Sequence, residues 1–136
     1  VAYHALGYLN RYSEDEFSTH AAAALLAVAE GAPEHFEAFL SDLMAQRLAS
    51  DSPITVEMLD DIAEQVGVPR EVIDTFADQR YLDMVEAQTT AARDLGIQSI
   101  PQVMLNGVLM EDVDFTQPGL LPAWVELTLG STAKAE

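Results

Sequence analysis

The stretch from Gly96 to Met110 constrains the fold most strongly, because it contains the signals of a helix end, a strand, a tight turn and a second strand. Gly96 follows a helical pattern, and glycine is the usual residue just beyond a helix. Asn106 and Gly107 form the dipeptide most typical of a two-residue hairpin, since both tolerate the positive φ of a type I′ turn. Pro101 stands at the first residue of the first strand, where a missing N–H does least harm to the ladder. The stretch therefore predicts a β-hairpin directly after a helix.

Apolar residues at helical spacing fill most of the chain before this hairpin. Ser13 and Glu16 match a capping box, which predicts a helix that ends at Gly31. The apolar residues 1–9 predict a strand at the start of the chain. Further helices are expected after Pro33, Thr55 and Pro69, from after Asp78 to Leu95, and from Pro118 or Pro122 onward.

The charge of the chain is strongly negative. Its 136 residues, enough for about one domain, carry 23 acidic and 6 basic residues, for a formal net charge of −17. Such a charge repels nucleic acid and anionic lipid, so neither is expected as a partner. We interpret the acidity mainly as a contribution to solubility. No apolar run approaches the roughly 20 residues that a membrane span requires.

The chain contains no cysteine. It therefore has no disulfide, no thiolate nucleophile and no zinc–thiolate site. None of its histidines, His4, His20 and His35, has a histidine partner three or four residues away that would complete a metal pair, so no metal site is predicted. Adjacent carboxylates such as Asp60 and Asp61 are interpreted as solvated charge, and Trp124 as a core residue.

The order of a helix, Gly96, the sequence Ile-Gln-Ser-Ile-Pro, an apolar run and Asn-Gly resembles the cis-proline loop and hairpin of thioredoxin-fold proteins of the DsbA-like branch. Residues 62–68, Ile-Ala-Glu-Gln-Val-Gly-Val, with the short and long helices after them, are similar to the second half of that family. The resemblance covers nearly the whole chain. It implies an α/β, thioredoxin-like fold: one partial domain over residues 1–130, with a helical insertion at about 13–77 and a tail at 131–136.

The family's chemistry belongs to a Cys-x-x-Cys motif at the N-terminus of a helix that follows a strand. Both elements precede the part of the family that residues 1–9 resemble, and this sequence contains neither. The resemblance thus implies a fold without its N-terminal strand and Cys-x-x-Cys helix, and no catalytic residue is assigned. A start at Val1, without methionine, suggests a processed or trimmed product. Because the absent strand would leave backbone groups unpaired, we expect a homodimer or association with the missing segment.

The resemblance assigns Ser99, Ile100 and Pro101 to substrate binding, with the backbone of Ile100 as the edge that pairs with an extended substrate. The sequence does not decide whether the bond between Ile100 and Pro101 is cis. His4 is a candidate neighbour of the active site, and a surface or structural role is its alternative. His20 has a weak metal role or a surface role as alternatives, and His35 is expected at the surface.

The function implied is that of a bacterial thiol:disulfide oxidoreductase domain acting on protein or peptide thiols and disulfides, without a bound cofactor and inactive as the chain stands. One alternative is an enzyme similar to kappa-type glutathione transferases or isomerases, which share the helical insertion. Another is a redox-inactive binding module that keeps the fold and its peptide-pairing edge. The resemblance implies an extracytoplasmic location, secreted or membrane-anchored, and a cytoplasmic one stays open.

Overall fold

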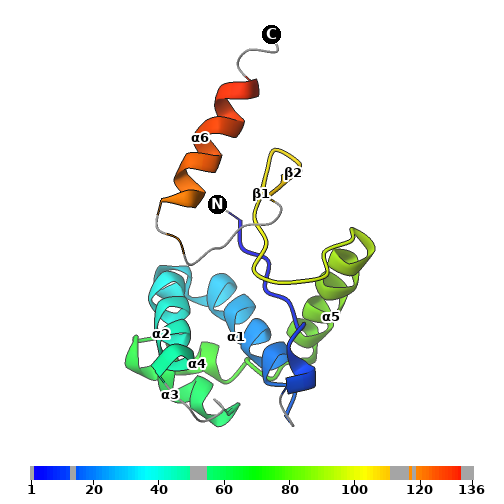
Figure 1. Cartoon of the computed structure of the whole chain (residues 1–136). Coiled ribbons are helices and arrows are strands. Elements are labelled where there is room, and N and C mark those ends of the chain that lie inside the picture. The colour runs from blue at the N-terminus through cyan, green and yellow to red at the C-terminus, as the bar shows by residue number, and fades with distance from the viewer. Residues whose placement is uncertain (1, 13–14, 50–54, 111–116, 118, 133–136) are drawn as a thin grey trace. The chain divides into compact units, whose positions relative to one another are not determined.

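The computed structural model describes residues 2–12, 15–49, 55–110, 117 and 119–132 of the chain (Figure 1). The chain divides into two compact units, which are described separately. Unit 1 comprises Val1–Gly96 and unit 2 comprises Ile97–Glu136. Among the described residues, no helix has the length and apolar character needed to cross a membrane.

Unit 1 is helical. Its described residues form two short 3₁₀ helices, η1 and η2, and five α-helices. The elements are η1 (Asn10–Tyr12), α1 (Phe17–Gly31), η2 (Pro33–His35), α2 (Phe36–Ala49), α3 (Glu57–Gln65), α4 (Arg70–Ile73) and α5 (Gln79–Asp94). Pro33 lies at the first position of η2, where a backbone N–H would have no partner within the helix, so its absence costs no hydrogen bond. Gly67 has a φ of 86° and separates α3 from α4.

Helix α1 lies at the centre of unit 1, between α2 and α5 (Figure 1). The alanines of its middle turns are buried, and their small side chains let the neighbouring helices approach closely. Around them pack larger apolar residues from the other helices. The largest fully buried side chains are Phe39, Leu59, Val28 and Val85. This core positions the N-terminal segment and the long helix α5 that leads to unit 2.

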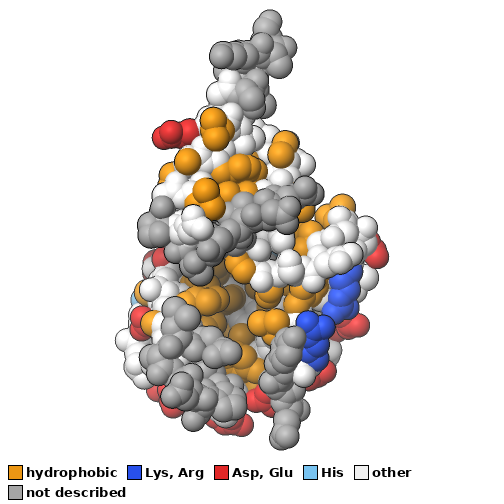
Figure 2. All heavy atoms as spheres, in the orientation of Figure 1, with side chains coloured by type: hydrophobic (Ala, Val, Ile, Leu, Met, Phe, Trp, Pro, Cys, Tyr) orange, Lys and Arg blue, Asp and Glu red, His pale blue; other side chains and the backbone are white. Residues whose placement is uncertain are grey.

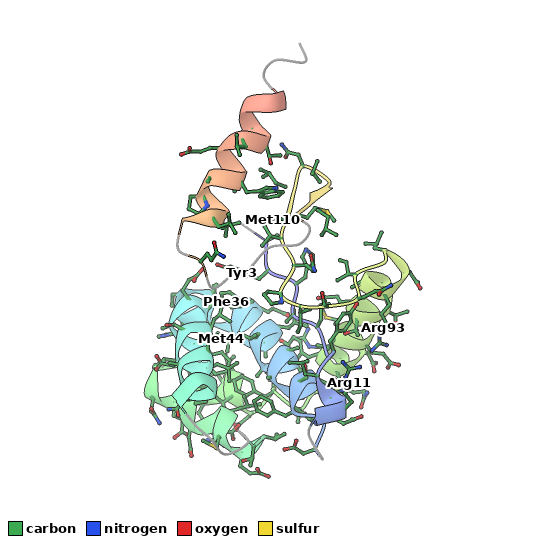
Figure 3. The ribbon with its side chains drawn as sticks, viewed as in Figure 1. Tyr3, Arg11, Phe36, Met44, Arg93 and Met110 are labelled. Carbon is green, nitrogen blue, oxygen red and sulfur yellow. The ribbon has the colours of Figure 1, made fainter. Side chains whose placement is uncertain are left out.

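The strand expected over residues 1–9 is not formed in the described part of that segment. A strand requires ladder bonds to a neighbouring strand, and here the backbone bonds to side chains instead. The N–H of Gly7 donates to Thr89 Oγ1 over 2.9 Å, and the carbonyl of Leu6 accepts from Ser18 Oγ over 3.1 Å. Figure 3 shows Tyr3 of this segment beside Phe36, and their ring centroids are 5.5 Å apart. The segment is thus packed on helices of unit 1.

The capping box expected at the first helix is also wrong. Helix α1 begins at Phe17, and Glu16 occupies the N-cap position with a φ of 53° and no side-chain cap bond. Ser13 lies outside the described residues. Asn10 provides a different constraint on this helix end: its Oδ1 accepts from the N–H of Thr19 over 3.0 Å, and its Nδ2 donates to Thr19 Oγ1 over 2.7 Å. The asparagine of η1 therefore holds the first turn of α1 at Thr19, a residue that the expected capping box did not involve.

Unit 2 contains the expected hairpin and a terminal helix. Strands β1 (Met104–Leu105) and β2 (Val108–Leu109) pair antiparallel, with Met104 opposite Leu109 and Leu105 opposite Val108. Asn106 and Gly107 have φ values of 51° and 81°, as the two-residue turn requires. Helix α6 (Leu120–Thr132) follows and carries a largely apolar surface (Figure 2).

Candidate functional site

The three residues assigned to substrate binding lie at the entrance to the hairpin, within unit 2. The bond between Ile100 and Pro101 is cis. All three side chains are exposed, and that of Ile100 is 37% accessible. Gln102 Nε2 donates to Ser99 Oγ over 3.1 Å. In the part of the chain that the structure describes, the backbone of Ser99, Ile100 and Pro101 makes no hydrogen bond.

The first strand of the hairpin continues this row of unpaired backbone groups. The N–H of Met110 donates to the carbonyl of Val103 over 2.8 Å, which makes these two residues a hydrogen-bonded pair. Residues of an antiparallel strand alternate between bonding to the partner and pointing away from it. The N–H and C=O of Met104 therefore point away from β2. Together with the backbone of residues 99–101, they form what we call the 99–104 edge.

The 99–104 edge carries both polar and apolar side chains, and two large apolar ones, Ile100 and Met104, are accessible. Ile100 is 37% exposed and Met104 is 51% exposed, and Val108 on the paired strand is 51% exposed. Unpaired backbone donors and acceptors at a sheet edge can bond to an added strand, whatever its sequence. Apolar side chains beside them add contact area for the side chains of that strand. The arrangement can thus hold an extended polypeptide.

The contribution of Met104 was missed in the sequence. The sequence does indicate the outward position of Met104. A two-residue turn at Asn106 and Gly107 makes Leu105 and Val108 a hydrogen-bonded pair, and the residue before Leu105 must then point its N–H and C=O away from the partner strand. This register requires the turn to contain two residues, which the structure shows.

The histidines are separated from this edge in the sequence and lie in unit 1. His4 is exposed, and its place beside an active site stays a prediction. His35 is partly buried: its Nδ1 lies 3.0 Å from the carbonyl oxygen of Val66, and its Nε2 lies 3.8 Å from Glu34 Oε1. His35 thus ties η2 to the end of α3, rather than standing free at the surface. No group of three metal-ligating side chains occurs among the described residues.

His20 lines a small pocket of unit 1, about 250 Å³ in volume, whose walls include Leu59, Phe76 and two carboxylates, those of Asp60 and Asp74. Burial raises the pKa of Asp60 more than the nearby Arg70 guanidinium lowers it. Arg70 lies 3.7 Å from Asp60 and 2.9 Å from Asp74, and it also bonds to Glu64 over 2.6 Å. These four side chains form an exposed ion-pair network. Asp60 is therefore paired with Arg70, whereas the sequence analysis interpreted it as a solvated charge.

Trp124 was expected in the core, and the structure gives a different picture. Its side chain is only partly buried, and Leu127 on the same helix is 74% exposed. The apolar residues of α6 have the spacing of a core helix, but several of their side chains stay exposed among the described residues. Helix α6 is therefore an accessible apolar element of unit 2.

Comparison with known proteins identifies the family of the chain. No match was found among curated proteins, and none among solved structures. The model of the family described as DSBA-like thioredoxin domain matches residues 9–118, which include the helices of unit 1, the 99–104 edge and the hairpin. The absence of cysteine agrees with a member that lacks the Cys-x-x-Cys motif. The chain belongs to the family of DSBA-like thioredoxin domains.

Proposed function

We propose that the chain is the substrate-holding part of a thiol:disulfide oxidoreductase and binds an extended polypeptide along the 99–104 edge. The observation that carries the proposal is the unbonded, exposed backbone of residues 99–101, within the stretch that matches the family. The role of Ser99, Ile100 and Pro101 is to position the substrate strand through backbone hydrogen bonds.

The chemical step needs a thiol that this chain does not contain. In the proposed reaction, a thiolate on another polypeptide segment attacks one sulfur of the substrate disulfide. A mixed disulfide forms, and the second sulfur leaves as a thiolate. The 99–104 edge holds the substrate strand during this exchange, which requires no bound cofactor. The chain alone is therefore expected to be inactive in disulfide reduction.

The substitution Met104→Pro tests the edge directly. Proline removes the N–H that points away from β2, and such a residue is tolerated at a sheet edge because it leaves the ladder bonds to the partner strand in place. We expect binding of an extended, uncharged peptide with alternating valine and serine to weaken about tenfold, as measured by calorimetry. The control is Met104→Leu, which keeps the N–H and is expected to bind as the unchanged chain does.

Equal affinity of the proline and leucine variants would contradict the proposal. Loss of the hairpin is a separate outcome, and the amide spectrum of residues 105–110 detects it. In that case, the same peptide with N-methyl groups at alternate residues replaces the variant as the test, because it lacks the N–H groups that an edge strand needs.

For the intact protein we propose the fold that the family implies: a thioredoxin-like domain over residues 1–130, in which a segment at about 13–77 is the helical insertion. An extracytoplasmic location, secreted or membrane-anchored, is part of the same proposal. It is supported by the family assignment alone.

We also propose that the unpaired edge associates with a second copy of the chain or with another segment of the family fold. Two copies repel each other, because each has a formal net charge of −17. We therefore predict that any dimer fraction in sedimentation velocity rises between about 0.05 M and about 0.5 M NaCl, where the charges are screened. A dimer that dissociates as salt is added would contradict this prediction.

The absence of cysteine favours a second candidate function, a redox-inactive binding module that uses the same edge. The two functions differ in what binds. A binding module is expected to hold a linear peptide whether or not it contains a disulfide. The oxidoreductase proposal requires the chain to accept a peptide that carries a disulfide beside the paired strand.

A further inference from the structure

Gln102 follows the three residues assigned to substrate binding, and only one of the two polar atoms of its side chain makes a hydrogen bond. Its Nε2 donates to Ser99 Oγ over 3.1 Å, at an exposed position. Its Oε1 is buried and has no hydrogen-bond partner among the described residues. A buried acceptor without a donor destabilises a folded chain, and an apolar side chain of similar shape would avoid this effect. Stability therefore does not account for the amide at position 102.

The bond from Gln102 determines how the hydroxyl of Ser99 is used. A serine hydroxyl donates one proton and accepts through its oxygen, whereas an amide nitrogen only donates. In the bond to Gln102, the Ser99 oxygen is therefore the acceptor, and the hydroxyl proton points elsewhere. Within the described part of the chain, no acceptor takes this proton. Because Ser99 is exposed, its hydroxyl is an available donor at the start of the 99–104 edge.

The backbone of Gln102 belongs to the same edge. Val103 and Met110 form a hydrogen-bonded pair, so both neighbours of Val103, Gln102 and Met104, direct their N–H and C=O away from the partner strand. Side chains two residues apart lie on one face of a strand. A residue of an added strand opposite Gln102 would thus place its side chain beside the carboxamide that holds Ser99. The Ser99 hydroxyl can therefore contact a side chain of that strand as well as its backbone.

We propose that Gln102 is a positioning residue, which presents the Ser99 hydroxyl as a hydrogen-bond donor to the strand held at the 99–104 edge. The preferred strand carries a neutral side chain with a carbonyl acceptor, asparagine or glutamine, at the position next to Ser99. A carboxylate would also accept, but the net charge of −17 repels it. The inference rests on the proposed function, since it names the class of substrate that this edge holds.

Two peptides measure this contact: acetyl-Val-Asn-Val-Asn-Val-amide and a matched form with leucine in place of both asparagines, each with the same polyethylene glycol tail for solubility. Leucine is similar in size to asparagine and has no acceptor. Both are titrated by calorimetry into the whole chain and into Ser99→Ala. We expect Ser99→Ala to weaken the asparagine peptide about fivefold and the leucine peptide by less than about twofold.

Gln102→Glu separates positioning from packing. An ionised carboxylate only accepts, so at pH 8 it would take the proton of the Ser99 hydroxyl and leave the bound strand without this donor. We expect Gln102→Glu to weaken the asparagine peptide about fivefold, as Ser99→Ala does, and to leave the leucine peptide within about twofold. The double variant is expected to lose no more than either single variant, because both changes remove one donor.

Gln102→Met removes the unpartnered oxygen and keeps the shape of the side chain. We expect its urea midpoint to equal or exceed that of the unchanged chain, because no buried acceptor is left without a donor. Its affinity for the asparagine peptide is expected to fall about twofold to fivefold, since the hydroxyl of Ser99 is then free to rotate. If Gln102→Glu disturbs the hairpin, as the amide spectrum of residues 105–110 shows, Gln102→Met carries the test.

The outcomes separate this inference from the proposed function. Equal losses of the two peptides with Ser99→Ala would overturn the donor role of Ser99 and leave the peptide-holding edge in place. If Ser99→Ala behaved as expected but neither variant of Gln102 changed the affinity, the positioning role would be wrong. A lower urea midpoint of Gln102→Met, with equal losses of both peptides, would make Gln102 a structural residue. If neither peptide bound to the unchanged chain, the edge itself, and with it the proposed function, would be wrong.

Discussion

At the scale of single residues, Gly7 is the glycine at which an added Cβ atom would make the closest contact with another residue. A Cβ atom built on Gly7 would lie 2.6 Å from Thr19 Oγ1 and 3.6 Å from Val85 Cγ1. Thr19 already bonds to Asn10 through this hydroxyl, so it cannot move without breaking that contact. We predict that Gly7→Ala lowers the free energy of unfolding by about 1–3 kcal/mol in urea denaturation.

Gly130 in α6 provides the control for this substitution. A Cβ at Gly130 would meet no atom within 4 Å, so Gly130→Ala is expected to leave stability unchanged or to raise it by up to about 1 kcal/mol. Equal effects of the two substitutions would contradict the close contact at Gly7.

Single residues also show the limit of prediction from the sequence. Asn106 and Gly107 predicted their turn correctly, because their preference for positive φ is a property of the residues themselves. The need for glycine at position 7 was not predictable, since it depends on Thr19 and Val85, which only the folded helices bring to that place. The same holds for the partly buried state of His35, which the end of α3 provides.

At the scale of elements, helices α1 and α5 are joined by a polar cluster. Tyr81 is 2% exposed, its hydroxyl donates to Glu30 Oε2 over 3.1 Å, and the Arg80 guanidinium lies 4.3 Å from the centre of its ring. Burial, and then the bond to Glu30, raise the pKa of Tyr81 above its ordinary value of 10.0. The neutral hydroxyl therefore stabilises the folded chain, and ionisation removes that contribution.

This cluster gives a pH-dependent prediction. Because the folded pKa of Tyr81 is raised, its stabilising effect is fully present below pH 10.0 and is lost as the pH rises through the folded pKa. We predict that Tyr81→Phe costs about 0.5–1.5 kcal/mol of unfolding free energy at neutral pH, and that the gap between the two proteins closes at high pH. Tyr3→Phe, at a residue that is 54% exposed, is the control. A gap that stays constant with pH would show that the bond to Glu30 contributes nothing.

Elements differ in how far their sequences determine them. The helices were predicted with small errors at their ends, because apolar spacing and the residues Gly31, Gly67 and Gly96 mark them locally. The strand at residues 1–9 failed, since a strand depends on a partner that the described residues do not provide. Pro101 and its neighbours were predicted as the candidate site from a resemblance, whereas the outward position of Met104 depended on the register of the hairpin.

At the scale of the whole molecule, the buried apolar cluster is unevenly distributed. Its described members, from Ala21 to Val85, all belong to unit 1. The single tryptophan, Trp124, belongs to unit 2 and is partly exposed. Regions with few buried apolar contacts open at lower free energy than the core.

The two units are therefore expected to unfold at different concentrations of urea. Trp124 fluorescence follows unit 2, and far-ultraviolet circular dichroism follows mainly the helices of unit 1. We predict that the urea midpoint measured by fluorescence is lower than the midpoint measured by circular dichroism. The peptide of alternating valine and serine is expected to raise only the midpoint measured by fluorescence, because it binds unit 2. Coincident transitions by both probes would contradict the prediction.

The most direct test of the central claim is an amide NMR titration of the whole chain with the uncharged peptide of alternating valine and serine. We predict that the largest shifts occur at the N–H groups of Ile100 and Met104, which make no hydrogen bond among the described residues. Val108 and Met110, whose N–H groups face the first strand of the hairpin, are expected to shift less. Shifts centred elsewhere, for example around the pocket beside His20, or no shift at saturating peptide, would show that the 99–104 edge does not hold a polypeptide.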